Sequence, residues 1–147
     1  MKPTVKVKKL TETAVLPKYS TLSAAGADLC ANTQEEIVIK PGQTVFVKTG
    51  ISLEIPEGYV GLIYARSSSA CKRGLAPANK VGVIDSDYRG EVMVALLNHS
   101  DTEQTIQPNE RIAQLVITPY LAVDFTESDE LSDTTRGEGG FGSTGKI

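Results

Sequence analysis

The chain has few histidines and cysteines and no apolar run long enough to cross a membrane. Its 147 residues include one histidine, His99, and two cysteines, Cys30 and Cys71, which lie far apart in the sequence. A zinc site needs three or four nitrogen or sulfur ligands, so hydrolysis by a protein-held zinc is close to excluded. No apolar run approaches the roughly 20 residues of a membrane span, and no apolar segment of the kind found in signal peptides follows the N-terminal lysines. We therefore expect a cytoplasmic, or otherwise intracellular, protein with no membrane partner.

Basic residues are too few for a protein that coats nucleic acid. Lys and Arg total 15 and Asp and Glu total 18, which gives a formal net charge of −3. Binding along a phosphate backbone needs a strong basic excess, so we expect no nucleic-acid partner. Hydrophobic residues make up 40% and charged residues 22% of the chain, which is typical of one globular domain.

What the sequence does contain predicts an all-β fold. Turn residues stand at 41–42, 56–58 and 108–109, and the runs between them are short and rich in β-branched residues. Runs of this length and spacing are typical of a β-sandwich or barrel. We expect strands at 36–40, 44–48, 51–55, 59–64, 81–84, 91–97 and 111–118. Because the run 92–97 is apolar throughout, we expect that strand to be buried on both faces.

One short helix is predicted at 67–73. Serines stand at its start, basic residues in its last turn, and Gly74 where it stops. In the surrounding segment, ARSSSACKRG, the side chains of Arg66, Ser67 and Ser68 gather at the expected helix N-terminus. An unpaired helix N-terminus with an arginine beside it suits a phosphate group. The alternative is ordinary N-capping by serine.

The segment NKVGVIDSDYRGEV (79–92) contains a candidate catalytic base. Two β-runs flank its Asp, Ser and Gly residues, which predicts a hairpin loop. Asp85 would lie at the end of a buried strand, and we expect it to be partly desolvated and able to accept a proton from water. Tyr88 adds a flat ring with a polar tip. The alternative is a solvated turn with no further role.

Two other segments place a polar residue among apolar ones. Gln114 interrupts the apolar run 110–117, and a buried glutamine must be hydrogen-bonded, so it either braces a loop or contacts a ligand. In AGADLCA (25–31), Asp28 precedes an expected apolar turn, where it either holds a metal-bound water or caps the turn.

The end of the chain differs in composition, and we divide the chain into a β domain at 1–121 and an arm at 122–147. Acidic residues without a basic partner occupy the arm as far as Arg136, which is typical of an extended linker. The ten residues 136–145, RGEGGFGSTG, then contain five glycines. Such a backbone can wrap a ligand with its N–H groups pointing inward, and Phe141 is free to lie flat on a base. The alternative is a terminus that binds nothing. Together, two anion cradles, a base, a stacking ring and an acidic residue favour a nucleoside triphosphate as the ligand.

In this order, the segments resemble the motifs of the trimeric dUTP pyrophosphatases (dUTPases). They read AGADL, ARSSS, NKVGVIDSDYRG, ERIAQL and RGEGGFGSTG, and together they cover nearly the whole chain. The resemblance implies a β jelly roll that assembles as a homotrimer with active sites at the subunit interfaces. It also implies Mg²⁺-dependent hydrolysis of dUTP to dUMP and pyrophosphate, in which water attacks the α-phosphorus. This reaction keeps uracil out of DNA and supplies dUMP for thymidylate synthesis.

The resemblance also implies a role for each site residue. Asp85 matches the residue that orients and deprotonates the water, and Tyr88 the ring that stacks on the deoxyribose and excludes a 2′-OH. Asn79, Gly82 and Val83 match the positions that bind the base. The phosphate contacts match Arg66, Ser67, Ser68 and Gln114, and Asp28 matches an acidic residue near the waters of the magnesium ion. In the arm, which closes over a neighbouring subunit's substrate, the matching residues are Arg136 for the γ-phosphate, Phe141 over the uracil, and Gly142, Ser143 and Thr144 for the phosphates.

One motif departs from the family pattern, and other interpretations remain. Many members read Pro-Arg-Ser-Gly where this chain has Ala65 and Ser68 around Arg-Ser, which bears on local phosphate geometry and therefore on rate. A dCTP deaminase would have a similar fold, but the segments 79–90 and 136–145 argue against it. A module that only senses nucleotides would be favoured by loss of Asp85 or of the arm, and both are present. A structural β-domain without a ligand would not explain the ordered motifs.

Overall fold

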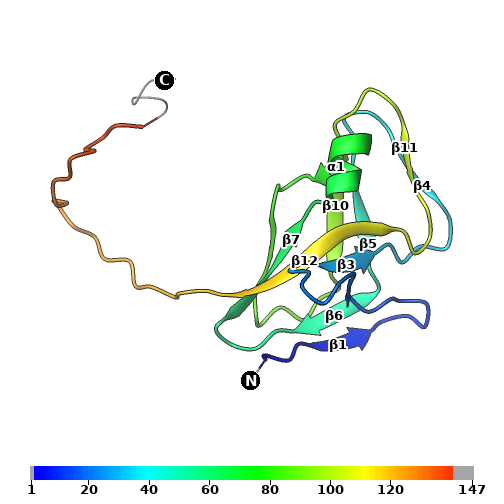
Figure 1. Cartoon of the computed structure of the whole chain (residues 1–147), viewed down its shortest axis with the longest axis horizontal. Helices are drawn as coiled ribbons and strands as arrows, with labels where there is room; N and C mark the ends of the chain where they lie inside the picture. The colour runs from blue at the N-terminus through cyan, green and yellow to red at the C-terminus, as the bar shows by residue number, and fades with distance from the viewer. Residues whose placement is uncertain (1, 141–147) are drawn as a thin grey trace.

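The computed structural model describes residues 2–140 and is built almost entirely of short strands (Figure 1). The strands are β1 (Lys6–Lys9), β2 (Lys18–Tyr19), β3 (Ala27–Cys30), β4 (Ile37–Ile39), β5 (Thr44–Lys48), β6 (Ile51–Glu54), β7 (Tyr59–Tyr64), β8 (Leu75–Pro77), β9 (Gly82–Ile84), β10 (Met93–Asn98), β11 (Gln104–Ile106) and β12 (Arg111–Pro119). One helix, α1 (Ser67–Arg73), lies between β7 and β8. The prediction of an all-β, jelly-roll-like sandwich with one short helix is confirmed.

The strands form antiparallel sheets of unequal size. The largest has the order β2-β3-β12-β7-β9, a second has the order β5-β10-β8, and the pairs β1-β6 and β4-β11 complete the body. Each expected strand is present, with bounds that differ by at most two residues. The five elements β1, β2, β3, β8 and β11 were not predicted as strands, because they are short and have few consecutive β-branched residues.

A single cluster of buried side chains joins all four sheets. Leu29 and Leu115 belong to the largest sheet, Leu96 to the second, and Ile51 and Ile39 to the two pairs, and none is more than 3% exposed. Removing a side chain of this size from water contributes about 1.5–3 kcal/mol. The apolar residues that the short strands contribute on one face therefore hold together sheets that are not joined by strand pairing.

Strand β10 corrects the expectation that it is buried on both faces. Val94 and Leu96 are buried, but Met93 is 42% exposed and Ala95 is only half-buried. The side chains of a strand alternate between its faces. Only one face of β10 meets the core, and Met93 and Ala95 line a pocket on the other face.

The segments around two candidate residues also differ from expectation. Asp28 lies inside strand β3 and not before a turn, because β3 is paired on both sides by β2 and β12. The expected hairpin at 79–92 is absent as a paired unit: β9 pairs with β7, whereas β10 pairs with β5 and β8. The loop carrying Asp85 and Tyr88 therefore crosses from one sheet to another.

Helix α1 has the expected bounds and stop signal. Gly74 adopts the left-handed conformation (φ 65°) that ends the helix, and Arg66 is the N-cap residue, without a side-chain capping bond. The N-capping alternative for the serines is therefore wrong. At the other end, Arg73 donates hydrogen bonds to Gln104 and to the carbonyl of Thr105, and it pairs with Glu110. These contacts fix the helix against β11 and the start of β12.

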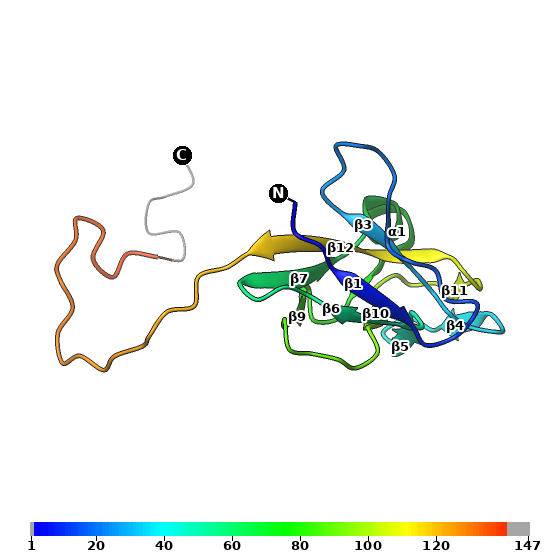
Figure 2. The same ribbon diagram turned by 90° about the horizontal axis from the view of Figure 1, so that it is seen from below.

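After β12, the chain leaves the body as an extended segment. Residues 120–140 contain no helix or strand, and both views show them running away from the sheets (Figures 1 and 2). The residues of the arm that lie beyond 140, namely Phe141, Gly142, Ser143 and Thr144, are outside the described range. Within residues 2–140, no helix has the length and apolar character needed to pass through a membrane.

Candidate active site

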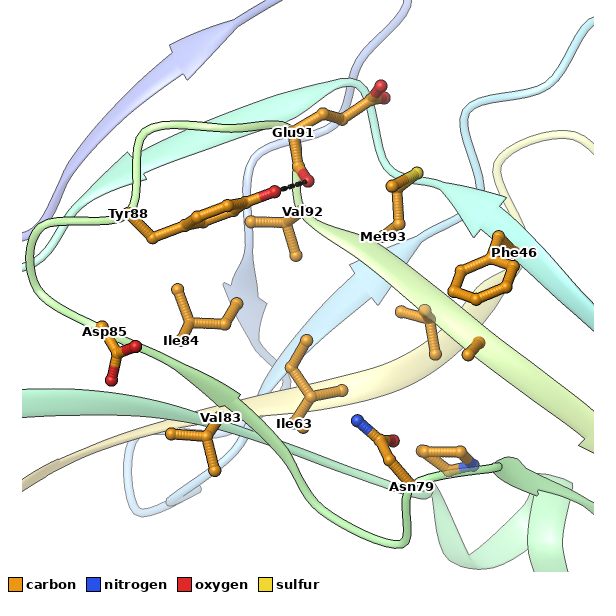
Figure 3. A pocket seen from close by; sticks show the side chains of 14 residues that line it. Phe46, Ile63, Asn79, Val83, Ile84, Asp85, Tyr88, Glu91, Val92 and Met93 are labelled. Atoms are coloured by element: carbon orange, nitrogen blue, oxygen red, sulfur yellow. Dashed lines mark hydrogen bonds between the residues drawn. The ribbon is translucent and has the colours of Figure 1, made fainter.

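A pocket of about 240 Å³ opens on the face of β10 that does not meet the core (Figure 3). It is lined by residues of the five strands β5, β7, β8, β9 and β10 and of the two loops that flank β9. Its lining residues are Phe46, Ile63, Pro77, Asn79, Gly82, Val83, Ile84, Asp85, Tyr88, Glu91, Val92, Met93, Val94 and Ala95. In the view of Figure 3, Asp85 and Tyr88 lie toward one side and Asn79 and Phe46 toward the other. An apolar floor with a few polar groups at its ends is the usual form of a small-molecule site.

Asp85 and Tyr88 are placed by the loop that follows β9. The N–H of Tyr88 donates to the carbonyl of Asp85 at 3.2 Å, and the hydroxyl of Tyr88 donates to the carbonyl of Glu91 at 3.1 Å. Asp85 is exposed, so the expectation that burial partly desolvates it is wrong for the single chain. It comes just after the last residue of β9, where the chain turns away from the core. Its carboxylate is therefore open to solvent at the pocket rim.

The residues expected to bind the base lie around the start of β9. Asn79 is exposed in the turn between β8 and β9, and Val83 is 63% exposed on the strand. Gly82 is buried against β7, where an added Cβ would lie 3.2 Å from the Cβ of Ile63. Because Gly82 has no side chain, the backbone of β9 itself borders the pocket at this position. Backbone N–H and C=O groups placed in this way can form hydrogen bonds with the edge of a base.

A second group of polar residues surrounds Asp28. One carboxylate oxygen accepts a hydrogen bond from Arg66 Nε at 2.8 Å. The other accepts from Ser20 Oγ at 3.0 Å and from Arg111 Nη1 at 3.2 Å. Burial raises the pKa of Asp28 most, but the hydrogen bonds from Ser20 and Arg111 and the charge of Arg66 together outweigh it and hold this pKa below its ordinary value. Asp28 therefore stays charged, and both its oxygens are engaged by the protein.

Gln114 and the start of α1 adjoin this group. Gln114 Nε2 donates to the carbonyl of Ala65 at 2.9 Å, which braces the backbone just before Arg66. A Cβ at Gly26 would lie 2.5 Å from Gln114 Oε1, so only glycine leaves room for this amide. Ser67 and Ser68 are exposed on the first turn of α1, and Ser68 Oγ accepts from Arg66 at 3.3 Å. These polar residues lie together, and we call them the Asp28 cluster. Its members are Asp28, Arg66, Ser67, Ser68, Arg111 and Gln114.

One chain does not bring the two sets of residues together. The Asp28 cluster contributes no residue to the lining of the pocket. Arg136 lies in the extended arm, where its Nε donates to the carbonyl of Gly139 at 2.8 Å. The sequence did not indicate Phe46, Glu91 and Met93 as pocket residues, because each belongs to a strand pattern that reads as ordinary sheet.

The described residues offer no preformed cage for a metal. Within 2–140, no group of three or more His, Cys, Asp or Glu side chains is placed to hold an ion. Mg²⁺ often keeps most of its waters and binds through one or two carboxylates together with substrate phosphates. A carboxylate such as Asp28, whose oxygens are already engaged, suits contact through a water of the ion and not direct coordination.

Comparison with known proteins gives a consistent result. The family model described as dUTPase matches residues 12–145. The deoxyuridine 5′-triphosphate nucleotidohydrolase of Hydrogenobaculum sp. (strain Y04AAS1) is 52% identical over 139 residues, covering 95% of this chain and 96% of the relative. That of Nautilia profundicola is 49% identical over 142 residues, covering 97% and 99%.

Solved structures agree with this result. The dUTPase of Staphylococcus bacteriophage 80alpha with dUPNHPP superposes with a TM-score of 0.88 at 31% identity, covering 97% of this chain and 98% of that one. An aspartate-to-asparagine variant of the phage phi11 dUTPase of S. aureus has a TM-score of 0.77 at 27% identity, covering 86% and 97%. Its structure describes the coordination of a structural Mg(II) ion.

Proposed function

The chain belongs to the dUTPase family and hydrolyses dUTP, and we propose that it releases dUMP and pyrophosphate by attack of water on the α-phosphorus. The observation that carries the mechanism is the pocket, which has a carboxylate and an aromatic ring at one side and an amide at the other. A pyrimidine deoxynucleotide presents a flat base, a sugar and a phosphate in that order, which matches this arrangement.

Base and sugar are recognised by shape and by polar groups. Asn79 and the backbone beside Gly82 and Val83 read the polar edge of uracil, and the pocket beside them admits no methyl group at the position where thymine carries it. The Tyr88 ring stacks on the deoxyribose and occupies the space that a 2′-OH would need. A steric clash of this kind discriminates against the ribonucleotide, which has one more oxygen atom, without any specific contact to it.

Asp85 supplies the base for the chemical step. Its carboxylate orients a water molecule and accepts a proton from it as the water oxygen bonds to the α-phosphorus. The bond between the α-phosphorus and the bridging oxygen to the β-phosphorus breaks, and pyrophosphate leaves with the electron pair. Phosphoryl chemistry of this kind depends on positioning and on neutralising charge more than on covalent catalysis.

The Asp28 cluster and the triphosphate complete the charge balance. Arg66, Ser67, Ser68 and Gln114 bind the phosphates, with Asp28 holding the guanidinium of Arg66 in place. Asp28 would hold Mg²⁺ through water, and the bound ion would offset part of the negative charge of the triphosphate. The charged carboxylate of Asp28 suits such an ion, and the guanidinium groups of Arg66 and Arg111 beside it suit the phosphates that would carry the ion.

The separation of the pocket from the Asp28 cluster supports a site shared between chains. We propose a homotrimer in which the pocket of one subunit faces the Asp28 cluster of another. The segment 122–147 acts as an arm that closes over a neighbouring subunit's substrate, with Arg136 at the γ-phosphate, Phe141 over the uracil, and Gly142, Ser143 and Thr144 near the phosphates. Such closure would exclude bulk water and complete the site. In the cell, the reaction would keep uracil out of DNA and supply dUMP for thymidylate synthesis.

Replacing Asp85 tests the proposed mechanism. Asp85→Asn keeps the size of the side chain but removes the base, so turnover of dUTP falls by a factor of about 10² or more. Binding of the non-hydrolysable analogue dUPNHPP, measured by calorimetry, stays within a few-fold of the wild-type affinity. Normal turnover by the variant would show that another group activates the water. If the wild-type chain binds dUTP without hydrolysing it, the protein is a nucleotide sensor.

A further inference from the structure

The Tyr88 ring is held by its neighbours and not by its own loop alone. Tyr88 is 44% exposed, and the loop 85–90 lies at the rim of the pocket, so an unrestrained ring could rotate into solvent. Two features prevent this. The ring lies close against the backbone of Gly90. Its hydroxyl donates to the carbonyl of Glu91 at 3.1 Å, as Figure 3 shows.

Gly90 is the surface on which the ring rests. A Cβ at this position would lie 2.5 Å from Cζ and 2.9 Å from Cε2 of Tyr88, which is closer than carbon atoms can approach. The neighbouring atoms belong to a ring that is already pinned at its hydroxyl, so a side chain at position 90 must displace the ring. Glycine is therefore required here by space and not by backbone conformation.

Glu91 is in turn tied to the turn between β5 and β6. The N–H of Gly50 donates to Glu91 Oε1 at 2.9 Å, and Gly50 has a φ of 68°, which favours glycine. Val92, which follows Glu91, is held by the same turn: the buried hydroxyl of Thr49 donates to the carbonyl of Val92 at 2.6 Å. Lys48 lies 4.0 Å from the other carboxylate oxygen and is well exposed, so that ion pair contributes little.

We infer that Gly90 and Glu91 are positioning residues that seat the Tyr88 ring, so that rejection of ribonucleotides depends on them as well as on Tyr88. This role rests on the proposed function, in which the ring excludes a 2′-OH. Gly90 sets the height of the ring above the backbone, and Glu91 fixes the carbonyl that holds its hydroxyl. A small displacement of the ring is enough to admit one additional oxygen atom.

The test is the ratio of kcat/KM for dUTP to kcat/KM for UTP. Both nucleotides are assayed with the same preparation, so the ratio does not depend on the fraction of the chain that is folded. Gly90→Ala and Glu91→Ala each lower the ratio about tenfold or more, through faster hydrolysis of UTP relative to dUTP. Glu91→Gln keeps an oxygen for the N–H of Gly50, and Lys48→Gln removes only the exposed charge, so both stay within about twofold of the wild-type ratio.

The Tyr88→Ala variant distinguishes two failures: that of this inference, and that of the proposal that the Tyr88 ring excludes a 2′-OH. If Tyr88→Ala lowers the ratio but Glu91→Ala leaves it at the wild-type value, Glu91 does not seat the ring and the inference is overturned. If Tyr88→Ala itself leaves the ratio unchanged, the sugar is recognised elsewhere. Both the exclusion of a 2′-OH by Tyr88 and the positioning role of Gly90 and Glu91 are then wrong. A Gly90→Ala chain that cannot be purified leaves the decision to Glu91→Ala and its Glu91→Gln control.

Discussion

At the scale of single residues, one carboxylate organises the polar side chains around the start of α1. Asp28 bonds to two arginines and a serine from three different segments of the chain. Its side chain is 14% exposed, so these charged hydrogen bonds act in a partly dehydrated environment, where they are stronger than on the surface. Losing the charge at this position would leave the guanidinium groups of Arg66 and Arg111 without a charged partner.

Asp28→Asn is expected to lower the free energy of unfolding by about 2 kcal/mol at pH 7. Because folding lowers the pKa of Asp28 from its ordinary value of 3.8, its contribution is fully present above that pH and is lost as the pH falls through the folded pKa. Urea titrations of wild type and variant should therefore converge once the pH is below the pKa of Asp28 in the folded chain. An equal difference at every pH would mean that the charge of Asp28 does not stabilise the fold.

Glu54→Gln is the matched control for this titration. The pKa of Glu54 is also lowered, by a hydrogen bond from Lys6, but both side chains are exposed. Exposed ion pairs contribute little because water and salt screen them. We expect no measurable change in the free energy of unfolding at any pH.

Residues also differ in how far the sequence predicted their positions in the fold. Asp85, Tyr88 and Asn79 were predicted together, because they stand in one short segment whose motif is specific, and they line one pocket. The exposure of Asp85 could not be foreseen, since it depends on where the chain turns after β9. The seat of the Tyr88 ring could not be foreseen either, because Gly50 is distant in sequence and meets Glu91 only in the folded chain.

At the scale of elements, the sequence predicted the strands that carry continuous β-branched runs. Strand β3 was missed because Ala27 and Asp28 have low strand propensity, yet pairing on both sides overrides it. The prediction that β9 and β10 pair as a hairpin was wrong. Two strands joined by a short loop usually pair, but here the loop between them crosses from one sheet to another. Local patterns indicated where strands lie but not which strands are neighbours.

The end of helix α1 gives a prediction at this scale. Gly74→Ala is expected to lower the free energy of unfolding by about 2 kcal/mol, partly from the left-handed backbone and partly from crowding. An added Cβ would lie 2.8 Å from the Cβ of Ser100. Gly42→Ala is the control, because its φ is 74° but no atom lies within 4 Å of the added Cβ, so only about 1 kcal/mol is lost. Equal losses in urea titrations would show that crowding at Gly74 is negligible.

At the scale of the whole molecule, the arm and the separated polar groups carry the proposal of a shared site. The segment 120–140 makes no strand with the body of its own chain, and its apolar side chains Leu121, Phe125 and Leu131 are each 89% exposed or more. Side chains of this kind are stabilised by burial, and a neighbouring subunit would provide it.

Two inactive chains should restore activity when combined. A chain truncated before Arg136 keeps Asp85 but lacks the end of the arm, and the Asp85→Asn chain has the arm but lacks the base. Each alone is expected to have greatly reduced turnover. After co-expression and random mixing, roughly a quarter of the sites combine an intact Asp85 with a neighbour's arm, so pyrophosphate release should recover to about that level. No recovery in trimers shown to contain both chains would mean that the arm serves its own subunit.

The most direct test of the whole account is a comparison of four nucleotides with the purified full chain. Pyrophosphate release is measured with Mg²⁺ and, separately, dUTP, dCTP, dTTP and UTP. The pocket and the Tyr88 ring predict release from dUTP, with the other three nucleotides at background. Comparable release from UTP or dTTP would contradict the proposed reading of sugar and base, and no release from dUTP would contradict the assignment of the reaction.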